Sequence, residues 1–206
     1  MKEKIINLKE LSKIFSELRS EGKKIVHCHG VFDLLHIGHI KHFKEAKTFG
    51  DILVVSITPD EFVNKGHNRP AFTTSLRLEV LAALEPIDFV AANKWPIAVE
   101  TIKTIQPDIY CKGPDYRNHE KDITRKINEE SRSVKSVGGK IVYTNDITFS
   151  SSNILNKFMN VYYKFADKNR FNLFDCGLLK NLSGVSSSSI YPSSRKITFE
   201  EASLAN

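Results

Sequence analysis

Apolar residues recur along the chain with two periods, one typical of helices and one typical of buried strands. Between residues 8 and 21 they recur at helical spacing, and Gly22 follows as a stop signal. The apolar run "KIVHC" at 24–28 comes next and predicts a buried strand. Beyond His39 the helical spacing returns, and it ends at Gly50. The chain therefore opens with a helix, a strand and a second helix.

The same alternation continues to residue 163. Further strands are predicted at 51–57, 88–92, 108–112 and 140–144, and further helices near 74–84, 96–105, 120–136 and 151–163. Strands that alternate with helices of about ten or more residues are typical of βαβ units. We expect an α/β fold with a doubly wound, Rossmann-like, five-stranded parallel sheet and helices on both faces. Ligands bind such sheets outside the carboxyl ends of the strands, where the strand order reverses.

The end of the chain has a different composition. After about residue 164 the stretch "GVSSSSIYPSS" is rich in serine, and no long periodic pattern follows it. The sequence therefore predicts one folded domain over 1–163, followed by a serine-rich tail or linker over 164–206.

Composition and charge narrow the function classes. The chain has 206 residues, 41% of them hydrophobic, and 30 Lys and Arg against 24 Asp and Glu give a net charge of +6. That excess suits nucleic acid, a membrane surface or phosphorylated small molecules. No apolar stretch reaches the roughly 18 to 20 residues of a membrane span. Charged residues interrupt the start of the chain, "MKEKIINLKELSKIF", so it lacks the apolar region of a signal peptide. We expect a cytoplasmic protein without membrane attachment, and without a nucleic-acid partner because no recognition motif is present.

The three cysteines do not form a recognised pattern. Cys28, Cys111 and Cys176 are widely spaced and odd in number, which fits neither a disulfide framework nor a CxxC pair. We interpret them as buried small hydrophobes.

One short segment carries candidate chemistry, "GVFDLLHIGH" from Gly30 to His39. A tight turn at Gly30 and a close approach at Gly38 would expose backbone N–H groups at the start of the second helix, and such a terminus binds anions. His36 and His39 lie three residues apart on its first turn, so their imidazoles can donate to the same phosphate. The charge they meet grows in the transition state of a phosphoryl-type transfer.

Two other interpretations of these histidines stay open. In the first, His36 caps the helix and His39 is a satisfied core histidine. In the second, His27, Cys28 and His29 are ligands of a metal ion. Neighbouring side chains alternate across a strand, however, and the sequence has no second ligand pair with a recognised spacing. We therefore predict no protein-held metal.

The segment also carries a resemblance to a known family. "GVFDLLHIGHIKHFKEAK" followed by "GDILVVSITPDEF" resembles the cytidylyltransferase-like nucleotidyltransferases, whose HxGH signature is matched by His36, Gly38 and His39. The resemblance runs from about Lys24 to Phe158, through "KGHNRP", "SLRLEVLAALEPIDFV", "PDIYCKGPDY" and "FSSSNI". Within that superfamily the chain is most similar to the adenylyltransferase domains of ADP-heptose synthases, and next to glycerol-3-phosphate cytidylyltransferases.

The resemblance implies an activity and its partners. A nucleoside monophosphate would pass from a nucleoside triphosphate, ATP rather than CTP, to a sugar or polyol phosphate such as a heptose 1-phosphate, with release of pyrophosphate. Mg²⁺ would accompany the triphosphate, the chain would form a homodimer, and a separate or formerly fused sugar kinase would act beside it. The alternatives are a CTP-dependent enzyme of the glycerol-3-phosphate type and a nucleotide-binding regulatory module without turnover.

The resemblance also implies roles for matching residues. His36 and His39 would stabilise the triphosphate at the α-phosphorus, and Lys65 and Arg69 would bring positive charge to it, so these four are the candidate catalytic residues. The candidate nucleotide-binding residues are Gly30, Val31, Phe32, Asp33, Gly38, Arg77, Lys112, Gly113, Asp115, Ser150, Ser151 and Ser152. Among them, 30–33 would pack against the phosphates, 112–115 would meet the base and ribose, and the serines would meet the distal phosphates.

Each of these residues also has a structural interpretation. Lys65 and Arg69 would then be solvated loop charges, Arg77 a salt-bridge partner, and the three serines N-caps. Asp115 would cap the next turn, and Asp33 is structural in either case. One departure from the family bears on the base, because Pro114 stands where ADP-heptose synthases have a glycine and removes a backbone donor.

Overall fold

The structure, a computed structural model, describes residues 4–65, 69–117 and 126–145. These residues lie in the first of the two units into which the chain divides, Met1–Leu155. The predicted last helix at 151–163, the domain boundary at 163 and the tail at 164–206 lie outside the described residues, and so do Ser150, Ser151 and Ser152.

Helices and strands alternate as the apolar pattern predicts. Their bounds are α1 Leu8–Ser20, β1 Ile25–Gly30, α2 Ile37–Lys47, β2 Ile52–Ile57, the 3-10 turn η1 Asp60–Phe62, α3 Thr74–Ala82, β3 Phe89–Ala92, α4 Val99–Ile105, β4 Ile109–Lys112, the 3-10 turn η2 Pro114–Tyr116, α5 Lys126–Ser136 and β5 Lys140–Tyr143. None of the helices in these described ranges is long and apolar enough to cross a membrane.

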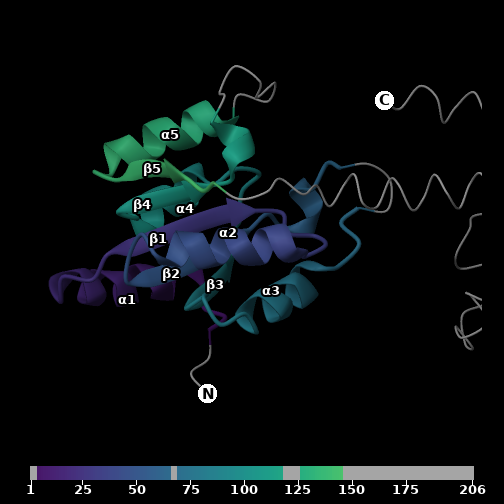
Figure 1. The fold of residues 1–206 in the computed structure, drawn as a ribbon, viewed down its shortest axis with the longest axis horizontal. Helices are drawn as coiled ribbons and strands as arrows, with labels where there is room; N and C mark the ends of the chain where they lie inside the picture. Colours follow the sequence, from purple (N-terminus) through teal and green to yellow (C-terminus); the bar gives the residue numbers. More distant parts are fainter. Residues whose placement is uncertain (1–3, 66–68, 118–125, 146–206) are drawn as a thin grey trace, which may run out of the picture. The chain divides into compact units, whose positions relative to one another are not determined.

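The strands form one five-stranded sheet in the order β3-β2-β1-β4-β5, and every pairing is parallel (Figure 1). The predicted α/β, doubly wound fold is confirmed. Because β2 and β3 continue from one side of β1 while β4 and β5 continue from the other, the strand order reverses between β1 and β4. The carboxyl ends of these two strands therefore mark the expected ligand site.

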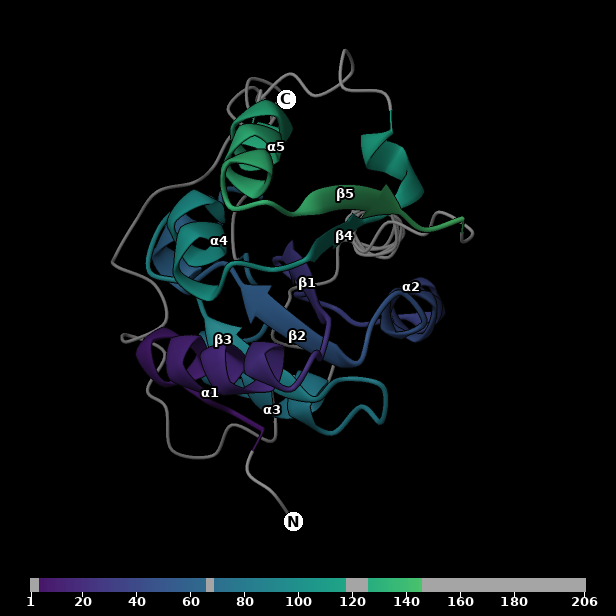
Figure 2. The ribbon, with the colours of Figure 1, turned by 90° about the vertical axis from the view of Figure 1, so that its left-hand side faces the viewer.

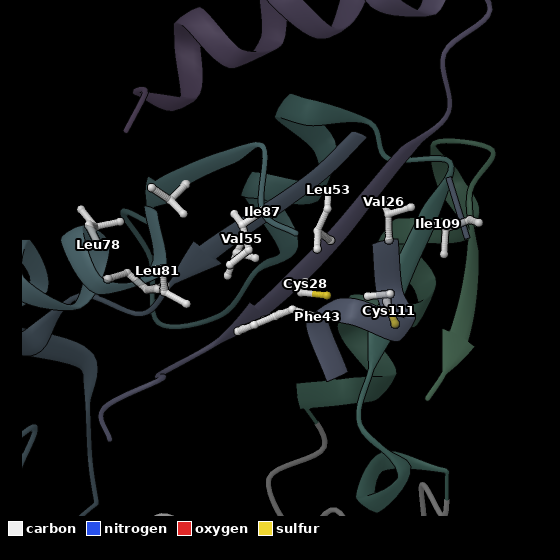
Figure 3. Packing of buried hydrophobic residues seen from close by; sticks show 13 residues of the cluster. Val26, Cys28, Phe43, Leu53, Val55, Leu78, Leu81, Ile87, Ile109 and Cys111 are labelled. Atoms are coloured by element: carbon white, nitrogen blue, oxygen red, sulfur yellow. The ribbon is translucent and has the colours of Figure 1, made fainter. Parts of the chain in front are cut away.

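Helices cover both faces of the sheet (Figure 2). On one face, Phe43 of α2 and Leu81 of α3 pack with Val26 and Val55 in a buried cluster (Figure 3). On the other face, α1 packs beside α4, and Leu11, Phe15 and Ile105 form a second cluster. The helix that carries the HxGH segment is thus fixed against the two central strands.

Local signals set the helix ends. Asn7 caps α1, because its side-chain oxygen accepts a hydrogen bond from the Glu10 N–H at 3.0 Å, and Gly22 follows with a φ of 79°. Gly50 has a different role from the predicted helix stop. A Cβ atom there would lie 2.7 Å from the Val26 side chain, so Gly50 is required by close packing of the chain before β2.

Candidate active site

The HxGH segment lies where the carboxyl end of β1 passes into α2. His36 occupies the N-cap position in an extended conformation, with φ −143° and ψ 173°, and His39 occupies the third helical position. The two imidazole rings stack with centroids 3.8 Å apart and planes 22° from parallel. The backbone N–H of His36 donates to His39 Nδ1 at 3.4 Å. Both rings therefore stand at a helix N-terminus, as the spacing predicts.

The turn that leads into the helix is made by Phe32. Its φ of 48° lies in the left-handed region, which a phenylalanine rarely adopts. Its ring packs edge-on against His39 at 5.4 Å and against Phe43 at 5.1 Å, so the ring anchors the histidine. A Cβ on Gly30 would lie 2.9 Å from the Phe32 ring. The sharp turn is thus at Phe32, while Gly30 provides room for its ring.

Both histidines are neutral in the free site at neutral pH. Burial, together with the charges of His36, His42 and Lys65, lowers the pKa of His39 to about 3. Burial also lowers the pKa of His36. Because His39 Nδ1 accepts the His36 N–H, the ring proton of the neutral imidazole sits on Nε2. His39 therefore presents a neutral N–H donor away from the helix start.

Asp33 ties the loop at 69–72 to this turn. Its buried carboxylate accepts Arg69 Nε at 2.6 Å, the Ala71 N–H at 2.7 Å and the Phe72 N–H at 3.2 Å. The Arg69 side chain is only 9% exposed, and one of its terminal nitrogens, Nη2, is buried without a hydrogen-bond partner among the described residues. Asp33 is structural, as expected, and it leaves Arg69 with a donor to offer an anion.

Lys65 adds a second cation beside the histidines. Its side chain is exposed, yet partial desolvation and then the charge of Arg69 lower the pKa of its ammonium. Lys65 in turn contributes to the lowered pKa of His39, so the three groups lie within electrostatic reach. Lys65 thus lies within electrostatic reach of both His39 and Arg69, an arrangement that is able to bind an anion.

Arg77 points into the protein. It is 2% exposed and donates to the backbone carbonyls of Phe72 at 3.0 Å, Val31 at 2.5 Å and Thr58 at 3.0 Å. It also pairs with the Asp60 carboxylate at 2.6 Å. This geometry favours the structural interpretation of Arg77, a salt-bridge partner, over contact with the nucleotide. Arg77 joins the loop after β1 to the loop after β2.

Lys112 is also paired inside the protein. Its ammonium lies 2.9 Å from the Glu130 carboxylate, and both side chains are less than a tenth exposed. Burial alone would lower the pKa of Lys112, but the charge of Glu130 and the nearby Tyr116 raise it overall. Glu130 further accepts the Tyr110 hydroxyl at 2.8 Å. Lys112 therefore stays charged as part of a buried network below the site rather than as an open cation.

The segment after Lys112 is more open. Gly113 is followed by η2, in which Asp115 is exposed, and a Cβ on Gly113 would meet no atom within 4 Å. Pro114 occupies the first position of η2, where a missing N–H is tolerated. The carboxyl end of β4, the strand that pairs with β1, is therefore uncovered at Gly113.

The second alternative for the histidines, a metal held by His27, Cys28 and His29, is not assembled. Nε2 of His27 and Nδ1 of His29 both bond to the Ser56 hydroxyl, at 2.7 Å and 2.8 Å. Cys28 instead belongs to the core cluster with Phe43 on the α2 side. The strand alternation separates these side chains, as expected.

The carboxylates near the site bear on how the expected Mg²⁺ would be held. Asp33 and Asp60, the carboxylates that the described residues bring to these loops, are both engaged with arginines and backbone N–H groups. Mg²⁺ commonly keeps several waters and is held largely by substrate phosphates. These residues fit an ion carried by the triphosphate rather than one held by the protein.

The fold is a doubly wound α/β sheet, and a helix N-terminus with two histidines lies at its strand-order switch, an arrangement that can bind phosphate groups. The sequence model of the Cytidylyltransferase-like family matches residues 27–190. The chain belongs to this family, and it is a nucleotidyltransferase enzyme. The resemblance read from the HxGH segment is thereby confirmed.

Curated relatives agree with this assignment. Proteins named "Bifunctional protein HldE" are 37% identical over 160 residues in Geotalea uraniireducens, covering 75% of this chain and 31% of that protein. The one in Campylobacter fetus is 39% identical over 156 residues, with the same two coverages of 75% and 31%. The chain thus spans less than a third of the length of these relatives.

Solved structures share the fold. The lipopolysaccharide core biosynthesis protein from Thermoplasma volcanium has a TM-score of 0.52 and 29% identity, and the match covers 62% of this chain and 100% of that one. Pantoate-beta-alanine ligase from Francisella tularensis, solved with beta-gamma ATP and beta-alanine, has a TM-score of 0.53 at 20% identity, and the match covers 83% of this chain and 80% of that one. The second likeness is one of fold alone.

Proposed function

We propose that this enzyme transfers AMP from ATP to a sugar phosphate of the heptose 1-phosphate type and releases pyrophosphate. The observation that carries the proposal is the pair of stacked, neutral imidazoles at the start of α2, with Arg69 and Lys65 beside them. The similarity to the HldE proteins supports ATP and a heptose-related acceptor. The likeness to a lipopolysaccharide core biosynthesis protein supports the same class of acceptor.

The chain's own groups supply binding and charge stabilisation. In the proposed reaction an oxygen of the acceptor phosphate attacks the α-phosphorus, the bond to the bridging oxygen of the β-phosphate breaks, and pyrophosphate leaves. No protein nucleophile is needed. The N–H of His39 Nε2 and the imidazole of His36 donate to the oxygens at the α-phosphorus, where charge develops. Arg69 and Lys65 offset the negative charge of the phosphates and orient them for in-line attack.

The remaining groups hold this arrangement in place. Asp33 fixes Arg69 through a 2.6 Å ion pair, and Arg77 fixes the backbone of Val31. Phe32 holds the His39 ring through an edge-on contact. Preorganised donors need no rearrangement when the charge appears, and for this reason they are worth more in a partly buried site than in water.

The nucleobase is proposed to lie over Gly113. A side chain there would meet open space, and Asp115 is exposed beside it. A Gly113→Ala substitution suits the backbone, because φ is −68°, so it leaves folding intact. We expect it to weaken nucleotide binding several-fold with no loss of thermal stability. Equal affinity in the variant would move the base elsewhere.

A pyrophosphate-release assay tests the whole proposal. ATP, CTP, GTP and UTP are each combined with heptose 1-phosphates, other sugar 1-phosphates and glycerol 3-phosphate in the presence of Mg²⁺. We expect turnover with ATP and a heptose 1-phosphate. Turnover with CTP and glycerol 3-phosphate would favour a cytidylyltransferase. Pro114 is compatible with that outcome, because it replaces a glycine of the ADP-heptose synthases and removes a backbone donor near the base. Nucleotide binding without turnover on any acceptor would favour a regulatory module.

The proposal extends to partners. A sugar kinase, separate or joined to this chain, would supply the acceptor phosphate, and the working form would be a homodimer. Leu76 and Val80, one turn apart on α3, are 47% and 51% exposed and offer an apolar surface for such a contact. Light scattering of the purified chain measures the mass directly.

A further inference from the structure

Three side chains that bind soft metals meet between the sheet and α2. Cys28 comes from β1, Cys111 from β4 and His42 from α2, and their ligand atoms all lie within 4.8 Å of one another. Cys28 and Cys111 are register partners on adjacent strands, and Figure 3 shows them side by side near Phe43. None of the three takes part in the proposed transfer reaction.

Both cysteines are free thiols and fully buried. Their surroundings are apolar, since Val26, Val55 and Ile109 belong to the same cluster. Two thiols and an imidazole from three separate elements form a donor set that apolar packing does not require.

The third ligand is held in a defined orientation. Nδ1 of His42 lies 3.0 Å from the hydroxyl of Thr144, a residue that is fully buried. A metal-binding histidine commonly bonds through its second ring nitrogen to an oxygen of the protein, which fixes the ring. Thr144 provides that oxygen, and Nε2 is then the nitrogen offered to a metal.

We propose that Cys28, His42 and Cys111 bind a thiophilic divalent metal ion, Zn²⁺, as three ligands of a tetrahedral centre whose fourth position is taken by water. Zn–S bonds of about 2.3 Å and Zn–N bonds of about 2.0 Å place the ligand atoms of a tetrahedral site roughly 3.5 to 3.8 Å apart. Since all three ligand atoms lie within 4.8 Å of one another, no pair has to close by more than about 1.3 Å.

The charges of such a centre balance. Each thiol releases its proton to solvent when its sulfur binds the metal, so one divalent cation and two thiolates sum to zero. A neutral centre suits an apolar interior, in which an isolated charge is costly. The nearest fixed cation is Lys112, and Glu130 already neutralises it. The three ligands do not form a sequence motif, because they come from the distant positions 28, 42 and 111.

The position gives the centre a consequence for the enzyme. His42 lies three residues after His39 on α2, so the metal would tie the HxGH helix to both strands of the strand-order switch. We expect it to raise thermal stability, and this effect is measured independently of turnover.

Metal titration of the reduced full-length protein tests the proposal, with Co²⁺ as a spectroscopic probe and Zn²⁺ as competitor. We expect one Co²⁺ per chain, with thiolate-to-cobalt absorption that Zn²⁺ abolishes, and a higher thermal midpoint with Zn²⁺. Cys28→Val and Cys111→Val should each abolish the absorption, and His42→Gln should weaken binding by about tenfold or more. Cys176→Ser is the matched control and should bind as the parent does.

Several outcomes would overturn the proposal. They are the absence of thiolate absorption in the parent protein, absorption that survives both valine variants, absorption that disappears in Cys176→Ser, and unchanged affinity in His42→Gln. X-ray absorption of the zinc-loaded parent protein is independent of whether the variants fold. Two sulfur ligands and at least one imidazole support the centre, and any other count of sulfur rejects it.

Discussion

Replacing Arg77 by methionine separates a supporting residue from one that contacts the nucleotide. The guanidinium is 1% exposed and serves the carbonyls of Val31, Thr58 and Phe72 and the carboxylate of Asp60. Methionine fills a similar space without a donor, so three carbonyl groups lose a hydrogen-bond partner. Both loops that Arg77 joins would lose their common anchor.

The expected cost follows from these contacts. A lost hydrogen bond to a buried group costs about 1 kcal/mol, so three such bonds amount to about 3 kcal/mol. The ion pair adds little, because the Asp60 side chain is 40% exposed and solvent screens it. For a chain of this size 3 kcal/mol lowers the thermal midpoint by about 6 to 12 °C.

Thermal unfolding and nucleotide titration on the same samples form the assay. Arg77→Lys keeps the charge and part of the bonding, so it should lose about half as much stability as Arg77→Met. Arg132→Met is the control, since Arg132 is exposed on α5 and should have no effect. If Arg77→Met kept its thermal midpoint while ATP affinity fell, Arg77 would contact the nucleotide and the supporting role would be refuted.

Three further predictions concern the histidines and the buried ion pair. His36→Ala and His39→Ala should each lower kcat by about 10² to 10³ with much less loss of nucleotide affinity, and near-normal kcat in both folded variants would reject their catalytic role. Folding stability should fall as the pH drops from the ordinary histidine pKa of 6.5 towards 3, because the unfolded chain takes up the proton that buried His39 refuses until about pH 3. Urea unfolding at about pH 7.5 and 5.5 measures this slope, which should be shallower in His39→Asn; equal slopes in the two proteins would contradict the assignment. Lys112→Met should cost about 3 to 5 kcal/mol by leaving Glu130 buried and unpaired, and adding Glu130→Gln should recover most of it, whereas additive losses would mean that the pair is not coupled.

The fold could be predicted from the sequence because its signals are local. Buried strands of a parallel sheet appear as continuous apolar runs, and the helices between them have a clear apolar face. The position of the HxGH segment follows from the same logic, since a motif after the first strand of a doubly wound sheet lies near the switch point. His36 and His39 therefore came together as their spacing predicts.

The rest of the site depends on contacts between distant residues. Arg77 and Lys112 match nucleotide-binding residues of the family in the sequence, but Asp60 and Glu130, 17 and 18 residues away, pair with them and the protein buries them. No periodic pattern marks such partners. The left-handed conformation of Phe32 was equally hidden, because glycine is the residue that normally signals it.

The strand-order switch has a consequence for how activity returns during refolding. The HxGH loop belongs to the first half of the sheet, β1 to β3, whereas Lys112 and the open segment after it belong to the second half. β1 pairs with β4 across more than eighty residues, as in the pairing of Val26 with Ile109. Contacts so distant in sequence form slowly, because the intervening chain must first be ordered. The two histidines can stack before β4 pairs, and because we propose that the nucleobase lies over Gly113, nucleotide binding should return only when β4 has joined β1.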